Sequence, residues 1–425
     1  MRHPNFELTL EFAREMDEKD PLKGFRNQFF LPKKKGKEAL YFCGNSLGLQ
    51  PRTVTTYINK DLKKWANQGV EGHFEGEVPW VDARKPSKSH LAALLGAKTE
   101  EVVAMNSLTV NLHLLLVSFY RPNGKKYKIL TESGAFPSDQ YVLESQLKYH
   151  GYDPEEALLE VSPRPGEHIL RTEDILQKIC HYKDDLALVM MSGVQYYTGQ
   201  CFDMKAISRE AGLHGIKVGL DLAHAIGNVP LSLHDWGVDF ATWCSYKYLN
   251  AGPGNVSGVF VHQKHGNDPE IPRFAGWWGY LEESRFEMKK GFLPMQGADG
   301  WLLSNDPVLG LGALQASLDI FSAAGLENIW TKSELLTGYL EFVIRETIGS
   351  RDVLQIITPS KPKDRGCQLS VLIPEGGKEI VEKWTENGVV VDWRKPNVVR
   401  LAPVPLYNTF QEVFAFSKIL QASLT

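Results

Sequence analysis

The chain has 425 residues, which is enough for one large domain and a smaller one. Its 47 Lys and Arg are balanced by 51 Asp and Glu, for a net charge of −4, so no basic surface argues for a nucleic-acid partner. The apolar runs are too short to span a bilayer, and the first residues lack the apolar region of a secretory signal.

The five cysteines are scattered along the chain, and no two of them form a CxxC pair. This usage is typical of a reducing cytosol, with neither a disulfide framework nor a zinc site. We therefore expect a cytoplasmic protein with no metal, no membrane partner and no nucleic-acid partner.

Short apolar runs alternate with amphipathic stretches through the middle of the chain. The predicted strands are residues 127–131, 186–191, 216–220, 239–243 and 259–262, and the predicted helices include 138–149, 172–182 and 204–213. This alternation predicts a mainly parallel sheet between two layers of helices. The unbroken apolar run at 186–191 fits a strand that is buried on both faces.

The last quarter of the chain has a different pattern. Residues 310–324 are rich in Ala and Leu and predict a long helix that leads into a second domain. Helices at 330–347 and 378–387, with strands at 353–358, 367–373, 389–392 and 398–401, predict a small α+β unit. We expect an α/β fold with an N-terminal segment 1–60 that packs with the small domain, a large domain 61–310 and a small domain 311–425.

Polar side chains follow several predicted strands at the point where each strand ends. They lie at residues 132–139, 192–193, 221–224 and 245–247. In an open parallel sheet the ligand binds beyond the carboxyl ends of the strands, so these stretches predict one site.

Asp221 and Lys247 stand 26 residues apart at the ends of successive predicted strands. One strand–helix–strand step separates them, so both should emerge side by side. Pyridoxal phosphate (PLP) chemistry needs this pair: a lysine that forms the imine, and a carboxylate that keeps the ring nitrogen protonated. Alone, either residue would be better explained as part of an ion pair or a helix cap at the sheet edge; together they favour a PLP site.

Two further stretches could serve such a cofactor. Residues 106–111 bring Ser and Thr hydroxyls to the start of an apolar helical run, where backbone N–H groups can bind a phosphate; plain helix capping explains them equally well. Phe136 could stack on a flat ring and Asp139 could accept a hydrogen bond, although Pro137 and Ser138 are also typical of helix initiation.

In this order, the motifs resemble those of the kynureninases, which belong to PLP fold type I in the aspartate aminotransferase superfamily. The resemblance covers nearly the whole chain. Its stretches are GNSLGL at 44–49, SLTVNLH at 107–113, FPSD at 136–139, YTGQ at 197–200, DLAHA at 221–225, HDWGVDF at 234–240, SYKYLNAG at 245–252 and RLAPVPLYN at 400–408. It implies hydrolysis of L-kynurenine or L-3-hydroxykynurenine to L-alanine and anthranilate or 3-hydroxyanthranilate.

The resemblance also implies a role for each matching residue. Lys247 would hold PLP as a Schiff base and then act as the base at the substrate Cα, Asp221 would bind the pyridinium, and Tyr246 would be the acid in the cleavage step. The implied cofactor contacts are Leu108, Thr109, Phe136, Pro137, Ser138, Asp139, Ser192, Asp221, His224, Tyr246, Lys247, Trp277 and Asn305. The implied substrate contacts are Asn45, Ser46, His73, Ser304, Asn305 and Arg400, with Arg400 as the clamp for the α-carboxylate.

Trp277 and Asn305 look like contacts that a second subunit lends, which implies a homodimer with shared active sites. His73, Ser304 and Asn305 look like the polar set of kynureninases that prefer the 3-hydroxylated substrate. Tyr280 departs from that pattern, which has His there, and its hydroxyl could fill the space of the substrate's own.

Three other interpretations compete with this one. A cysteine desulfurase or class V aminotransferase would share the fold, but a desulfurase needs a nucleophilic cysteine on a mobile loop, and Cys367 lies in a predicted strand. A nucleotide-binding oxidoreductase predicts GxGxxG after the first strand, which the sequence around Gly252 and Gly254 does not match. An inactive structural homologue should have lost Lys247 or Asp221, and both are present.

Overall fold

The large sheet positions the site. The computed structural model describes residues 5–424, and within them a seven-stranded sheet runs in the order β4-β10-β9-β8-β7-β5-β6. Its strands are β4 (Val102–Ala104), β10 (Gly258–Val261), β9 (Phe240–Trp243), β8 (Lys217–Asp221), β7 (Leu186–Ser192), β5 (Lys128–Glu132) and β6 (Leu158–Val161). Neighbours from β9 to β6 are parallel, whereas β10 is antiparallel to both β9 and β4.

The central strands are apolar on both faces because both faces are covered. In β7, Leu188 and Met190 join the core on one face of the sheet, whereas Val189 and Met191 join the core on the other face. Alternate side chains of a strand point to opposite faces, so a strand in the middle layer must be apolar throughout. The covering helices include α4 (Leu108–Phe119), α5 (Pro137–Tyr149), α7 (Thr172–His181) and α8 (Met204–Leu213).

The five strands predicted for this domain are present, each with bounds that differ by no more than a residue or two, and α8 has the predicted bounds. The edge strands β4 and β6 were not predicted. β4 has only three residues, and β6 is partly exposed and follows the four-residue helix α6 (Pro154–Ala157), so neither has a strong apolar pattern. The fold is therefore α/β with a mainly parallel sheet, as predicted.

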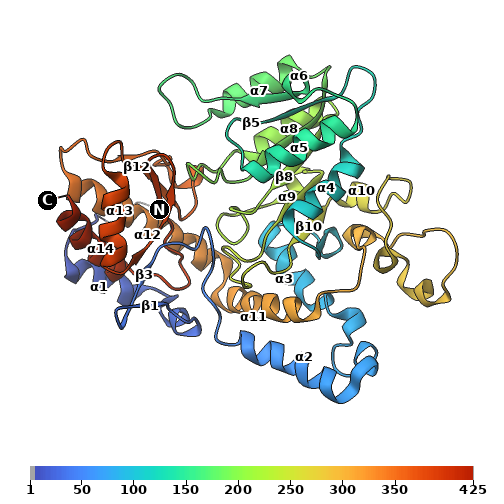
Figure 1. Cartoon of the computed structure of the whole chain (residues 1–425), viewed down its shortest axis with the longest axis horizontal. Helices are drawn as coiled ribbons and strands as arrows, with labels where there is room; N and C mark the ends of the chain where they lie inside the picture. Colours follow the sequence, from blue (N-terminus) through green and yellow to red (C-terminus); the bar gives the residue numbers. More distant parts are fainter. Residues whose placement is uncertain (1–4, 425) are drawn as a thin grey trace.

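A smaller antiparallel sheet lies in the C-terminal part, in the order β11-β12-β15-β14. Its strands are β11 (Gln355–Ile356), β12 (Leu369–Leu372), β15 (Val398–Leu401) and β14 (Asp392–Arg394). Helices α12 (Leu326–Ile348), α13 (Gly377–Glu386), α14 (Phe410–Ser423) and α1 (Leu10–Lys19) lie with it in the same unit, on one side of Figure 1.

Two strand predictions were wrong in this unit. The expected strand at 389–392 is two strands in two sheets, because β13 (Val389–Val390) pairs in parallel with β3 (Leu40–Tyr41) before β14 begins. The expected strand at 353–358 forms a ladder only at β11. In both places the local β propensity did not show where the chain stops pairing with one neighbouring strand and begins to pair with another.

The N-terminal segment contacts both units. Helix α1 packs against α14, and β3 adds to β13, whereas α2 (Val54–Gln68) runs along α11 (Val308–Ala324) beneath the large sheet. The remaining elements are α3 (Lys85–Leu95), α9 (Leu233–Trp236), α10 (Gln263–Gly266), β1 (Lys33–Lys34) and β2 (Lys37–Glu38).

Over the described part of the chain, no single helix is long and apolar enough to cross a membrane. α11 and α12 meet such a criterion only as a pair, by length and composition, and they are bent by 82° where they meet.

Candidate active site

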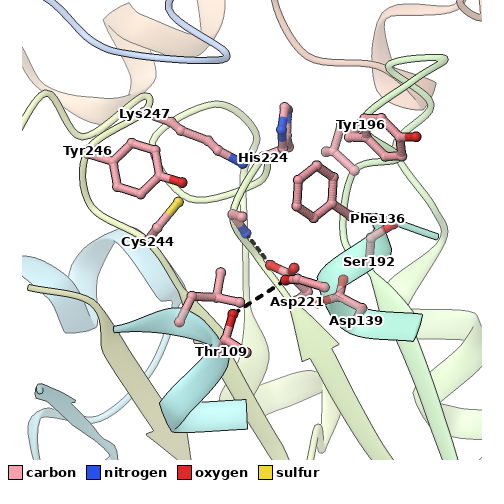
Figure 2. A pocket seen from close by; sticks show the side chains of 14 residues that line it. Thr109, Phe136, Asp139, Ser192, Tyr196, Asp221, His224, Cys244, Tyr246 and Lys247 are labelled. Carbon is pink, nitrogen blue, oxygen red and sulfur yellow. Dashed lines mark hydrogen bonds between the residues drawn. The ribbon is translucent and has the colours of Figure 1, made fainter. Parts of the chain in front are cut away.

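Most of the predicted cofactor contacts meet at the carboxyl edge of the large sheet, around a cavity of about 520 Å³ that is partly open to solvent; the predicted substrate contacts Asn45, Ser46 and Arg400 do not line it. Figure 2 shows side chains from several elements pointing into this space. The lining residues that the sequence predicted are Leu108, Thr109, Phe136, Ser138, Asp139, Ser192, Asp221, His224, Tyr246 and Lys247. The lining residues that it did not predict are Val194, Tyr196, Ala223 and Cys244. Pro137 does not line the cavity; it is the first residue of α5.

Asp221 and Lys247 reach the cavity from neighbouring parallel strands, as their spacing predicts. Asp221 is the last residue of β8 and is paired in register with Thr242 of β9. Its Oδ1 accepts the backbone N–H of Ala223 at 2.7 Å, which fixes the carboxylate at the strand end. Lys247 follows β9, and its Nζ lies 5.7 Å from the centre of the Phe136 ring.

Buried acidic groups surround Asp221. Asp139 in the first turn of α5 and Glu132 at the end of β5 are both almost fully buried. Burial, reinforced by the charge of Asp221, raises the pKa of the Asp139 carboxyl well above its usual range. Burial also raises the pKa of Glu132 to about 7, although hydrogen bonds from Ser192 oppose this. Burial thus holds Asp139 and Glu132 toward their neutral forms, so these two carboxyl groups place polar partners beside Asp221 and add little further charge.

Glu132 received no role from the sequence, although it stands at a predicted strand end. Its carboxylate accepts the Ser192 backbone N–H at 3.2 and 3.3 Å, and the Ser192 hydroxyl also donates to it. It therefore holds a cavity residue in place from behind.

The starts of two helices converge on the same cavity. Thr109 and Leu108 are in the first turn of α4, and Ser138 is in the first turn of α5; the Thr109 and Ser138 hydroxyl oxygens are 3.3 Å apart. No side-chain cap bonds to the N-terminus of α4 or α5. The first N–H groups of α4 have no partner within the helix, and together with the Thr109 and Ser138 hydroxyls they suit an anion such as a phosphate.

His224 and Tyr246 flank Lys247. Burial, followed by the charge of Lys247, lowers the pKa of His224 well below its usual value, so the imidazole is neutral. Burial raises the pKa of Tyr246, with Cys244 contributing, so the phenol keeps its proton at all physiological pH values.

Arg400 approaches from the small unit and is 1 % exposed. Its guanidinium pairs with Asp392, donates to the Ser46 hydroxyl at 3.0 Å and donates to the carbonyl of Tyr196 at 2.8 Å. Its Nε has no partner among the described residues. Asn45, the neighbour of Ser46, donates to Gln368 at 3.1 Å. Asp392 received no role from the sequence; it stands opposite Arg400 in the ladder between β14 and β15.

His73, Trp277, Ser304 and Asn305 do not line this cavity. Ser304 and Asn305 are exposed, Trp277 is 42 % exposed, and the His73 ring lies edge-on to Trp80 at 5.3 Å. Within one chain, then, these four residues and the cavity are separate.

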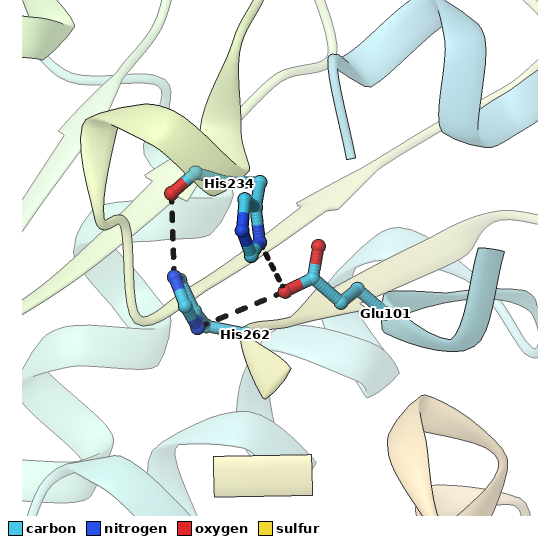
Figure 3. A group of neighbouring side chains, drawn as sticks. All are labelled: Glu101, His234 and His262. Carbon is cyan, nitrogen blue, oxygen red and sulfur yellow. Dashed lines mark hydrogen bonds and ion pairs between the residues drawn. The ribbon is translucent and has the colours of Figure 1, made fainter. Parts of the chain in front are cut away.

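A different group, Glu101, His234 and His262, has the composition of a metal site and was not considered from the sequence (Figure 3). It lies at the edge of the sheet opposite the cavity, where β10 ends and β9 begins. Its atoms already have protein partners. Glu101 Oε1 accepts from His234 Nδ1 and from the Gln263 N–H, both at 2.8 Å, and Oε2 accepts the Lys98 N–H at 2.8 Å. The group joins the segments before β4, at α9 and after β10.

The cavity residues fit PLP. Asp139 Oδ1 and His224 Nδ1 are buried and lack a hydrogen-bond partner within residues 5–424, which indicates room for a polar ligand. The helix starts suit its phosphate, Asp221 suits its ring nitrogen, and Lys247 supplies the amine.

Comparison with known proteins gives a consistent result. Residues 329–420 match the family model described as the kynureninase C-terminal domain. The kynureninase of Flavobacterium psychrophilum is 51% identical over 99% of both chains. The kynureninase of Nematostella vectensis is 49% identical over 98% of this chain and 94% of its own.

Among solved structures, the Escherichia coli cysteine desulfurase CsdA superposes with a TM-score of 0.75 over 95% of this chain and 98% of its own, at 15% identity. A mutant of the cystine C–S lyase C-DES, with glycine linked to its PLP cofactor, has a TM-score of 0.74 at 18% identity, over 90% of this chain and 96% of its own. These likenesses establish the fold.

The desulfurase alternative is not favoured. Cys367 is buried just before β12, and burial raises the pKa of its thiol to about 12, so it is not a reactive nucleophile on a loop. The relatives from Flavobacterium psychrophilum and Nematostella vectensis, each about half identical over nearly the whole chain, carry the same name. This chain belongs to the kynureninases, PLP-dependent hydrolases that cleave a carbon–carbon bond.

Proposed function

We propose that Lys247 and Asp221 carry the hydrolysis of a kynurenine-type substrate to L-alanine and an anthranilate-type acid. The observation that carries the proposal is their geometry: an amine and a carboxylate emerge from neighbouring parallel strands into one cavity, below two helix starts that suit a phosphate. Thr109, Ser138 and the N–H groups around them would bind the phosphate.

When bound, PLP supplies an electron sink for the carbanion at the substrate Cα. Asp221 would keep the proton on the ring nitrogen, on which that sink depends. Lys247 would first hold the cofactor and then, once the substrate amine replaces it, take the Cα proton on Nζ. The Tyr246 phenol, whose raised pKa keeps it protonated, would give a proton to the substrate β-carbon after cleavage.

Arg400 would bind the substrate α-carboxylate, with Ser46 and Asn45 beside it. Its free Nε and its place over the Tyr196 ring, 5.9 Å from the ring centre, support this role. Asp392 and the Ser46 hydroxyl would hold the guanidinium plane in place before the substrate arrives.

The protein would act as a homodimer with shared sites. Trp277, Ser304, Asn305 and His73 lie outside the cavity of their own chain, and aromatic rings near them are exposed: Phe74 by 55%, Phe286 by 51% and Trp277 by 42%. Phe286 packs edge-on against both of the other two, so the three form one apolar patch. A second copy placed on this patch would cover it and receive the polar residues beside it.

Three broader proposals follow from the sequence. The chain would divide into an N-terminal segment 1–60, a large domain 61–310 and a small domain 311–425. It would work in the cytoplasm, in tryptophan catabolism through the kynurenine pathway. Its product would be available for pyridine nucleotide biosynthesis.

We propose L-3-hydroxykynurenine as the preferred substrate, with some activity on L-kynurenine. A site with His73 and Asn305 near the aryl ring would form hydrogen bonds with the phenolic hydroxyl of L-3-hydroxykynurenine. With L-kynurenine bound, which lacks that hydroxyl, the polar atoms of the site would be left unpaired. The test is the ratio of kcat/KM for the two substrates, measured for the wild type and for His73→Phe. A ratio that favours L-kynurenine and does not change on substitution would refute the assignment.

The function itself is tested by the absorption spectrum. The purified protein should be yellow or become yellow with added PLP, and borohydride should fix the cofactor on the peptide that contains Lys247. A protein that gains no visible absorbance with PLP would refute it.

A further inference from the structure

Two residues that the proposed function assigns to the partner's site lie on a loop with a buried anchor. Ser304 and Asn305 are exposed, yet the next residue, Asp306, has a side chain that is only 1 % exposed. Asp306 Oδ2 accepts from both the backbone N–H and the Nη1 of Arg84, each at 3.3 Å.

Arg84 joins this loop to several surrounding segments, in addition to the hydrogen bond that the Trp278 N–H donates to the Leu303 carbonyl at 3.2 Å. It precedes α3 and its side chain is 2 % exposed. Its Nε donates to Asp299 at 2.8 Å, its Nη1 to the carbonyl of Val81 at 3.0 Å, and its Nη2 lies 3.7 Å from Glu282. One planar guanidinium thus fixes three segments: the loop with Asp306, the short helix Gly297–Trp301 and the short helix Glu282–Glu287.

A second buried arginine fixes the neighbouring segment that carries Trp277. Arg285 Nη2 donates to the carbonyl of Trp278 at 2.7 Å and of Tyr280 at 3.2 Å, and its guanidinium lies 4.4 Å from the centre of the Trp278 ring. Trp277 itself is left outside, with its ring against Phe286.

Burial of charges in this way is an inefficient means of stabilising a fold, because desolvation offsets much of the ion-pair energy. A forked guanidinium is well suited to fixing the orientation of the groups that it binds, since each of its N–H groups donates a hydrogen bond only within a narrow range of angles. Ser304, Asn305 and Trp277 are exposed and do not line the cavity of their own chain, so a fixed geometry of these segments would serve a neighbouring subunit.

We infer that Arg84 is a positioning residue for the active site of the partner subunit: it orients Ser304 and Asn305 through Asp306 and Asp299. This inference rests on the shared-site homodimer of the proposed function. A misplaced contact of about 1 Å can lower turnover on the order of 100-fold, so the Arg84→Met homodimer should lose about that factor in kcat/KM.

The test is complementation in hybrid dimers. Arg84→Met and Lys247→Ala chains are co-expressed with different affinity tags, and dimers are purified through both tags as holoenzyme. In the hybrid, one site combines the intact Lys247 of the first chain with the intact Arg84 of the second. It should show about half of the wild-type rate, because one of two sites is complete. A reference hybrid pairs Asn305→Ala with Lys247→Ala and should recover equally.

The outcomes separate the two proposals. If the reference hybrid recovers and the Arg84→Met hybrid does not, Arg84 acts within its own subunit and the inference is wrong. If the reference hybrid also fails, the shared site itself is wrong. A fully active Arg84→Met homodimer would likewise overturn the inference.

Two controls address folding. If Arg84→Met does not fold, Arg84→Lys takes its place, because it keeps the positive charge but lacks the forked guanidinium. It should show the same pattern in the hybrids with a smaller loss of kcat/KM. Arg365→Met removes another buried arginine, which pairs with Glu341 in the small unit. It should lower the thermal midpoint in a comparable way without the selective loss of kcat/KM.

Discussion

Glu132 lies behind the cavity and provides a quantitative test of its electrostatics. We consider Glu132→Gln in the apo-protein, a substitution that preserves the shape of the side chain and removes its ionisation. At low pH the native glutamic acid is itself neutral, so the variant and the wild type should be similarly stable there. The stabilities of the two proteins should diverge only at pH values where Glu132 of the wild type ionises.

The expected size follows from the pKa. Burial raises the pKa of Glu132 from 4.5 to about 7, so the folded chain binds this proton more tightly than the unfolded chain does. Stability therefore falls as the pH rises from about 4.5 to about 7, and it changes no further from this group above that range. A shift of about 2.5 pKa units at about 1.4 kcal/mol each gives a loss of about 3 kcal/mol.

Urea denaturation at pH 5, 6, 7 and 8, at one protein concentration, measures the free energy of unfolding of both proteins. The variant should gain stability relative to the wild type by up to about 3 kcal/mol between pH 5 and pH 8. Asp139 titrates in both proteins, and the substitution also removes the part of its raised pKa that the charge of Glu132 causes, which adds to the gain in the same direction. A difference that stays constant over this pH range would refute the assignment of a neutral, buried Glu132.

Three further predictions concern other parts of the molecule. Asp221→Asn should bind PLP and remain yellow but lose on the order of 100-fold or more in kcat, because the ring nitrogen loses its anionic partner; a kcat near the wild type would contradict this. Arg400→Lys should raise KM on the order of tenfold with a smaller effect on kcat, since one ammonium cannot keep the bonds to Asp392, Ser46 and Tyr196 and also bind the substrate carboxylate; an unchanged KM in steady-state kinetics would contradict this. Glu101→Gln should cost about 1–3 kcal/mol in urea denaturation and leave kcat/KM unchanged, since its hydrogen bonds with His234 and Lys98 lie at the opposite edge of the sheet; lost activity at full stability would argue against a purely structural role.

The parts of the fold that the sequence predicted well are those where local pattern and burial agree. β7 is apolar throughout because it is buried on both faces, and its predicted bounds differ from the observed ones by one residue. Asp221 and Lys247 could be found because the ends of parallel strands meet at one edge, a rule that needs no knowledge of side-chain contacts.

The parts that could not be predicted depend on long-range contacts. Tyr196 enters the cavity from the loop after β7, and its carbonyl is held by Arg400, 204 residues further along the chain. Asp392 meets Arg400 because β14 pairs with β15 and places the two residues opposite each other. No periodicity in the sequence carries this information, since each position depends on a segment that is distant along the chain.

The reversed direction of β10 has a consequence for the route of the chain. β9 runs toward the cavity and ends before Lys247, whereas β10 runs back and ends at Val261, beside the start of β9. The backbone N–H of His262 bonds to the carbonyl of Asp239 at 3.0 Å, so the following segment leaves from the back of the sheet. The long excursion from there to α11, seen at the margin of Figure 1, therefore starts on the side remote from Lys247. If β10 were parallel to β9, it would end at the carboxyl edge of the sheet, and the segment after it would begin beside Lys247 of the same subunit. One change in strand polarity thus leads the segment after β10 away from the carboxyl edge of the sheet, where Lys247 lies.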